Sequence, residues 1–163
     1  HQGGPMRTPA IAMLLLSCAT LQLSSQSTAQ EIAASFSKHK QVAKAKHGVR
    51  VEKYKDVQSE PTVRQNLSDY SGVYESDLGY VITVEVAGDG RVRATSNNIE
   101  LENARIEHGV LTADGFVGAF LTRTDRDSPT DPGTVSHGLG VILTKPVELG
   151  GNTYDRLFYQ LKR

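Results

Sequence analysis

Tyrosines are the residues of this chain with the clearest chemical potential, because each offers an apolar ring and a hydroxyl that forms hydrogen bonds. Half of the ten aromatic residues are tyrosines near the beginning and the end of the C-terminal region: Tyr70, Tyr74, Tyr80, Tyr154 and Tyr159. If their segments are neighbours in one sheet, they would line an opening that binds a small apolar or aromatic ligand. Core packing, with hydroxyls reaching water, is the alternative interpretation.

Carboxylates gather in the polar segment 122–134, at Asp125, Asp127 and Asp131. Several carboxylates on a loop suit calcium, but the segment lacks the glycine and terminal glutamate of an EF-hand loop. Aspartates also cap their own turns. The sequence leaves calcium binding open, so no residue is assigned as a metal ligand.

Catalytic motifs are not recognisable. Ser136 and His137 are adjacent, and neighbours on a strand point to opposite faces, which argues against a Ser-His-Asp triad. The chain has no nucleophile elbow, Walker loop or His-Glu-x-x-His motif. We assign no catalytic residue and no cofactor, and a small hydrolase or isomerase remains an alternative.

The elements that must position the tyrosines begin with the segment 70–95. From Tyr80 to Val86 every even position is apolar, with Thr83 and Glu85 between, which predicts a half-buried strand. A three-residue turn at 88–90 would then form a hairpin. Its register pairs Val86 with Val92, Val84 with Ala94, and Glu85 with Arg93.

Further hairpin turns are predicted at His108-Gly109, Asp114-Gly115 and Gly150-Gly151. The first two pair Ile106 with Leu111, Ala113 with Phe116, Leu111 with Gly118, and Val110 with Ala119. We therefore predict an all-β domain over residues 67–163. It would be a small antiparallel up-and-down barrel, or a strongly curved meander, of about eight strands.

Several of these strands are apolar on both faces, most clearly residues 116–121. If Phe120 fills the interior, Val117, Ala119 and Leu121 must point outward and need cover. A preceding helix could supply Ile32, Phe36 and Val42, or a second copy could dock there. We expect one of the two and slightly favour a partner surface, which includes a homodimer.

The region before the domain is basic. Glu31 to His47 predicts a helix and residues 49–66 a linker, and together they form the segment 30–66. Residues 31–64 carry eight Lys or Arg against four acids, whereas residues 65–163 carry nine against fourteen. The excess could contact anionic lipid, nucleic acid or the domain's own acidic face, or simply be solvated. We expect no nucleic-acid partner.

The first 29 residues resemble an export signal. Met6-Arg7 is followed by the apolar stretch 10–23 and a small-x-small cleavage site at 27–29, which predicts a mature start at Gln30. We expect a periplasmic or secreted protein. Alternatively, Leu15-Leu16-Ser17-Cys18 resembles a lipobox, and a lipidated Cys18 would then anchor the chain to a membrane.

The pattern Gly72-x-Tyr74-x-x-Asp77-Leu78-Gly79, followed by Thr83-Val84, resembles the first hairpin of avidin-type barrels and, more distantly, of lipocalins. The resemblance implies a calycin-like barrel with Ser76, Leu78 and Tyr80 at the ligand mouth. Tyr80 stands where that family has a small hydroxyl residue, and the chain has no Trp, so biotin binding is not implied.

Taken together, the predicted ligand-binding residues are Tyr74, Ser76, Leu78, Tyr80 and Tyr159. We expect an exported, non-catalytic binding or interaction module whose partner is a small apolar ligand or an envelope protein. An envelope docking protein that acts through an outer apolar patch is the alternative without a ligand pocket.

Overall fold

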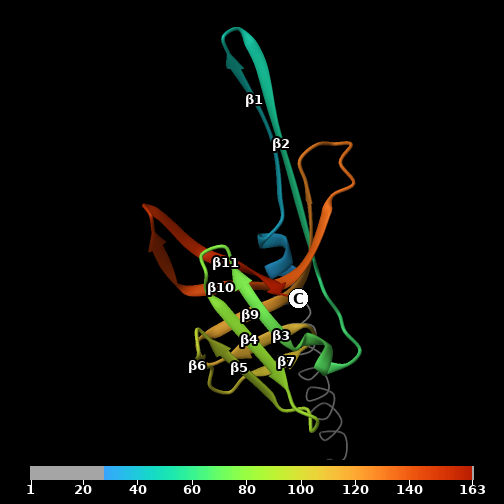
Figure 1. Ribbon diagram of the computed structural model, residues 1–163, viewed down its shortest axis with the longest axis vertical. Helices are drawn as coiled ribbons and strands as arrows, with labels where there is room; N and C mark the ends of the chain where they lie inside the picture. Colours follow the sequence, from blue (N-terminus) through green and yellow to red (C-terminus); the bar gives the residue numbers. More distant parts are fainter. Residues whose placement is uncertain (1–27, 163) are drawn as a thin grey trace, which may run out of the picture.

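The computed structural model describes residues 28–162, which form mostly antiparallel β-sheet (Figure 1). A helix covers residues 28–35, and the 3-10 helix η1 covers Leu67–Tyr70. The strands are β1 (Lys38–Lys46), β2 (Val49–Pro61), β3 (Gly72–Ser76), β4 (Val81–Val86), β5 (Val92–Ser96), β6 (Ile99–Glu100), β7 (Arg105–Glu107), β8 (Val110–Ala113), β9 (Phe116–Arg126), β10 (Thr134–Leu149) and β11 (Asn152–Lys162). The all-β prediction is confirmed: among the described residues, the predicted domain holds nine strands, β3 to β11, where about eight were expected, and β1 and β2 precede it.

From β3 to β11 the strands follow one another as a meander, and the first and last of them pair through Tyr159 and Ser76. Strand β9 has β10 along one edge, while β8 and β2 share the other edge. Within residues 28–162 no ladder joins β6 to β7, so the sheet is curved but open. The predicted barrel closure is therefore not confirmed.

The predicted hairpin registers are confirmed residue by residue. Val84 lies opposite Ala94, Ile106 opposite Leu111, and Leu111 opposite Gly118. The His108-Gly109 turn has positive φ at both residues, 51° and 72°, as a type I′ hairpin turn requires. Turn chemistry thus fixes which face of each strand meets the core.

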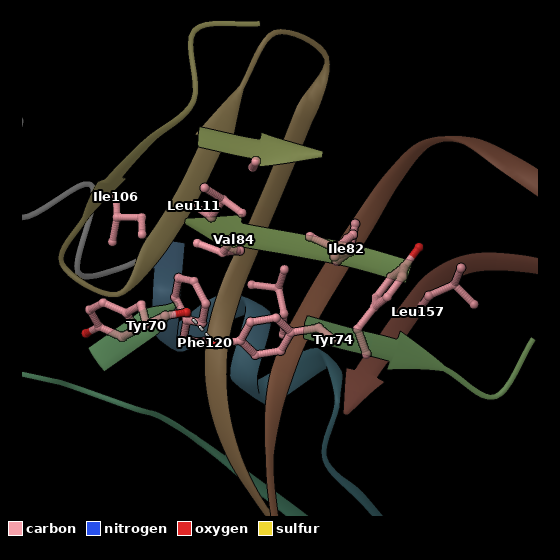
Figure 2. Close-up of a cluster of buried hydrophobic side chains, with 12 residues drawn as sticks. Tyr70, Tyr74, Ile82, Val84, Ile106, Leu111, Phe120 and Leu157 are labelled. Atoms are coloured by element: carbon pink, nitrogen blue, oxygen red, sulfur yellow. Dashed lines mark hydrogen bonds between the residues drawn. The ribbon is translucent and has the colours of Figure 1, made fainter. Parts of the chain in front are cut away.

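That face forms one hydrophobic core between the strands of the meander (Figure 2). Of the residues predicted to be buried together, Val86, Val92 and Phe116 are half-buried. The others are buried: Ile82, Val84, Ala94, Ile106, Leu111 and Phe120. The charged residues predicted between them are exposed: Glu85, Arg93, Arg105 and Glu107.

The predicted helix over Glu31 to His47 is wrong beyond residue 35. Strand β1 occupies residues 38–46, and the predicted linker 49–66 is mostly strand β2. The cause is the turn between them, where His47 (φ 54°) and Gly48 (φ 75°) repeat the His-Gly turn at 108–109. This turn pairs the two flanking segments, so the helical alternative cannot form.

The helix of residues 28–35 covers the second apolar face. Ile32 and Ala33 are buried against Ala119 and Leu121, which point away from the main core as predicted. Phe36 and Phe158 flank this outer cluster, with ring centroids 6.2 Å apart. The chain covers this face itself, so the expectation that slightly favoured a partner there gains no support. Val42, the third residue of the expected helical cover, lies in β1 and not in a helix.

Substitutions on the two faces of β7 should change the free energy of unfolding by different amounts. Ile106 is buried, so Ile106→Ala should lower the free energy of unfolding by about 2 to 5 kcal/mol through lost contacts and a residual cavity. Arg105→Ala, on the exposed face of the same strand, should change it by no more than about half a kcal/mol. Urea unfolding followed by circular dichroism measures both, and equal losses would contradict the assigned register.

Removal of the helix of residues 28–35, or of the Phe36 ring, should expose the outer apolar cluster to solvent. Phe36→Ala should cost about 1 to 3 kcal/mol, less than a fully buried phenylalanine because Phe36 is only half-buried. The exposed Gln30→Ala is the matched control on the same segment. A chain that begins at Lys38 should self-associate in size-exclusion chromatography with light scattering. A truncated chain that stays monomeric and equally stable would mean that the helix does not protect this face.

Candidate functional site

The tyrosine set is brought together as predicted, but Tyr70 and Tyr74 lie in the core and not at an open mouth (Figure 2). The Tyr74 hydroxyl donates to the Tyr70 carbonyl at 2.7 Å. The Tyr70 ring packs against Phe120, with centroids 4.4 Å apart, and its hydroxyl donates to the Thr62 carbonyl at 3.1 Å. Both hydroxyls are satisfied by backbone, which is how buried tyrosines are normally accommodated.

The other predicted ligand-binding residues also pack on this core. Ser76 and Tyr159 are buried and directly opposite each other across β3 and β11. The Ser76 hydroxyl accepts a hydrogen bond from the Tyr80 amide at 3.2 Å. Leu78 and Tyr80 are half-buried against the same cluster. The five residues are therefore close together, and their roles as ligand contacts stay a prediction.

The cavity beside Tyr74 is small. It has a volume of about 20 Å³ and lies between Tyr70, Tyr74 and Phe120. A single water needs roughly 10 to 15 Å³ of such volume, whereas drug-sized ligands occupy sites of about 300 Å³ or more. Around these aromatic rings the interior is filled by side chains and has room for one water.

The acidic loop is held by its own carboxylate. Asp131 accepts hydrogen bonds from the Gly133 amide at 2.9 Å and from the Asp127 amide at 3.1 Å. These bonds favour the ionised form and lower the pKa of Asp131. No group of three potential metal ligands occurs within residues 28–162. Capping of the turn thus accounts for Asp131, the second of the two interpretations.

One hydroxyl–imidazole pair was not anticipated from the sequence. Thr122 and His137 are directly opposite on β9 and β10, and Thr122 Oγ1 lies 3.2 Å from His137 Nδ1. Thr62 Oγ1 occupies the other side of that hydroxyl at 2.7 Å. Among the described residues, no carboxylate orients the second ring nitrogen of His137, and a triad needs such a group.

The exposed feature that stands apart from the body is the hairpin of β1 and β2, here called the ribbon, residues 38–55 (Figure 1). Residues 56–61 of β2 pair with β9, whereas residues 49–55 pair only with β1. The ribbon therefore extends beyond the rest of the sheet as two strands. It carries seven Lys or Arg against one acid, a net charge of +6.

The two sides of the ribbon differ in composition. Directly opposite residues of a ladder share a side. One side, here called the lysine side, holds the paired positions Lys38–Val57, Lys40–Lys55, Val42–Lys53, Lys44–Val51 and Lys46–Val49. The other side holds the pairs His39–Asp56, Gln41–Tyr54, Ala43–Glu52 and Ala45–Arg50. All six lysines and no acid fall on the lysine side.

At the base of the ribbon, acids neutralise most of the positive charge. A cavity of about 280 Å³ is lined by Lys38, Lys55, Arg123 and Arg156, among others. Lys55 pairs with Asp127 at 3.2 Å and Asp125 at 3.6 Å, Arg123 with Asp125 at 2.9 Å, and Arg156 with Asp155 at 3.1 Å. The hydrogen bond to Asp127 raises the pKa of Lys55.

Unpaired positive charge therefore lies on the ribbon itself. Lys38, Lys40 and Lys53 are exposed and make no ion pair with any described residue. The contact with the domain's own acidic face, one of the sequence-based alternatives, is made by Lys55 alone among the described lysines of the ribbon. The lysine side is the strongest candidate for an interaction surface.

Two patterns in the sequence indicate the hairpin that carries the lysine side. The His47-Gly48 turn matches the His108-Gly109 turn, and lysine at every second position from 38 to 46, with Val42 between, has the period of a strand. The absence of Gly and Pro from residues 31–47 favours a helix but is equally compatible with a strand.

Comparison of the chain with protein-family models, with curated proteins and with solved structures gave no match. The likeness of residues 72–84 to the first hairpin of avidin-type barrels thus stays a local resemblance. Among the described residues, no helix is long and apolar enough to span a bilayer.

Alkaline titration should report on the filled core. Burial raises the pKa of Tyr74 to about 12, from an ordinary value of 10.0. The folded state holds this proton more tightly than the unfolded state, so its contribution to stability is complete below pH 10 and is lost as the pH rises toward 12. Unfolding measured across this window should lose that pH dependence in Tyr74→Phe. Parallel losses in the wild type and the variant would show that Tyr74 is accessible to solvent.

Proposed function

We propose that this protein is an exported, non-catalytic interaction module that binds a partner through its ribbon, residues 38–55. The observation that carries the proposal is the ribbon's one-sided charge. Six lysines and no acid share one side of a hairpin that extends beyond the body of the sheet. Clustered charge of one sign attracts an oppositely charged partner and accelerates its encounter.

The filled interior supports an external site. The space beside Tyr74 and Phe120 holds about 20 Å³, too little for a small-molecule ligand. The apolar outer face is covered by Ile32 and Ala33, so docking through that face would require the helix to leave. Neither the space beside Tyr74 nor the covered outer face therefore competes with the ribbon as the contact surface.

The ribbon also adds little to the stability of the body. A two-stranded hairpin is marginally stable in water, and residues 49–55 have no third strand beside them. Among residues 38–55, the side chains that the structure describes contribute nothing to either hydrophobic cluster. A segment that the core does not need is well suited to contact with another molecule.

A hydrolase is the second candidate, because Thr122 and His137 form a hydroxyl–imidazole pair at 3.2 Å. It ranks below the interaction module since the pair has no orienting carboxylate among the described residues, and Thr62 already contacts the hydroxyl. Loss of a hydrolytic activity in His137→Gln with an unchanged fold would support it.

Photo-crosslinking tests the proposed function in cells that produce the protein. A photoreactive phenylalanine analogue at Lys40, exposed on the lysine side, should yield adducts with cellular components. The matched control places the same analogue at Asp89, at the exposed tip of the β4–β5 hairpin. Adducts that form equally at both positions, or only at the control, would refute the ribbon as the contact surface.

A further inference from the structure

The chemistry of the lysine side identifies a class of partner. Beyond the base, its paired positions alternate cation and apolar residue across the ladder: Val42 opposite Lys53, Lys44 opposite Val51, and Lys46 opposite Val49. At about 3.3 Å per residue, positions 40–46 extend over about 20 Å. Each of these three pairs thus joins one lysine position and one valine position on the same side of the ribbon.

We propose that the lysine side binds the surface of an anionic phospholipid bilayer; this rests on the proposed function, in which the ribbon is the contact surface. Lysine ammonium groups pair with lipid phosphates as flexible point charges. The valines paired with these lysines enter the boundary between headgroups and acyl chains. The methylene chains of the lysines lie beside the valines and carry the ammonium groups to the phosphates. An anionic bilayer thus offers contacts to both the lysines and the valines of this side.

Nucleic acid fits the same side less well. Recognition of bases uses arginine forks, and binding of single strands uses stacked aromatic rings. The only arginine and the only aromatic residue of the ribbon, Arg50 and Tyr54, belong to the opposite side. The valines of the lysine side would have no contact to make on a phosphate backbone.

Protection of a sheet edge does not explain the pattern either. Edge strands carry lysines to discourage pairing with other chains. That role accounts for lysines on both strands, because residues 49–55 of β2 have a free edge as β1 does. It gives no reason, however, for all six lysines to share one side of the ribbon.

The acidic body of the protein leaves most of this charge available. Lys55 is engaged by Asp127 and Asp125, but the exposed Lys40 and Lys53 are paired with no described acid. Each lysine near an anionic bilayer strengthens binding roughly fivefold. Lys40, Lys44, Lys46 and Lys53 together should therefore contribute about 10²-fold or more at low salt, and less as salt screens them.

Vesicle flotation of the folded full-length domain tests the inference. The wild type should bind vesicles that contain phosphatidylglycerol, bind those of pure phosphatidylcholine much more weakly, and be released by salt. Combining Lys40→Gln, Lys44→Gln, Lys46→Gln and Lys53→Gln should lower binding about 10²-fold or more. The matched control removes four exposed cations from the body through Arg91→Gln, Arg105→Gln, Lys145→Gln and Lys162→Gln, and should lower binding only a few-fold.

The valines distinguish a lipid surface from other polyanions. Val49→Thr with Val51→Thr keeps β-branched residues and all charges, and should weaken vesicle binding several-fold. Binding of heparin or single-stranded DNA should not change in this variant. If it changes equally, or if these polyanions bind as tightly as the vesicles, the lipid inference is overturned.

Two further outcomes separate this inference from the proposed function. If Lys40 gives adducts in cells but the wild type ignores anionic vesicles, the ribbon is an interaction surface and its partner is not a bilayer. If light scattering shows a dimer that the four Lys→Gln changes dissolve, the lysine side meets the acidic body of a second copy, and the lipid inference fails. Unchanged unfolding midpoints confirm that the variants are folded.

Discussion

Strand β9 must bury both of its faces, and the rest of the structure depends on that constraint. Phe120 points into the main core, while Ala119 and Leu121 point to the outer cluster. One edge of the strand pairs with β10, and the other is divided between β8 and β2. The absence of a side chain at Gly140 lets Phe36 approach, since a Cβ there would lie 2.7 Å from Phe36 Cε2. Glycine at this β10 position thus leaves room for the Phe36 ring beside the helix on the outer face.

The hairpins of the domain could be predicted because their turns and strand patterns are encoded by residues close together in the sequence. A type I′ or three-residue turn sets the register of its own hairpin, and period-2 alternation then sets the buried face, so Val84, Ile106 and Leu111 could be placed from sequence. Residues 31–47 failed the same approach because lysine and alanine are compatible with both a helix and an exposed strand, and pairing with β2 decides between them. Barrel closure would need a ladder between β6 and β7, which are separated by only four residues and form none in the part of the chain that the structure describes.

The proximity of the predicted ligand-binding residues could be derived from the sequence, but their burial could not. Strand order brought Tyr74, Ser76 and Tyr159 together, as the meander implied. Whether such a group lines a mouth or fills a core depends on the volume of the side chains opposite, and Phe120 occupies that space in the structure. The charge asymmetry of the ribbon, in contrast, needed only the correct secondary structure. Once residues 38–55 form a hairpin, the sequence alone places every lysine on one side.

Strand β2 joins the ribbon to the rest of the sheet, and its pairing partners differ between its two ends. Its residues 56–61 complete the sheet against β9, with Val57 buried, whereas residues 49–55 pair only with β1. The outer segment is marginally stable alone, so the inner segment must anchor it. A partner that binds the ribbon orders a segment on which the core does not depend, and the ribbon's charges can vary without loss of core stability. In the proposed function, folding and recognition therefore fall to different segments of one continuous strand, β2.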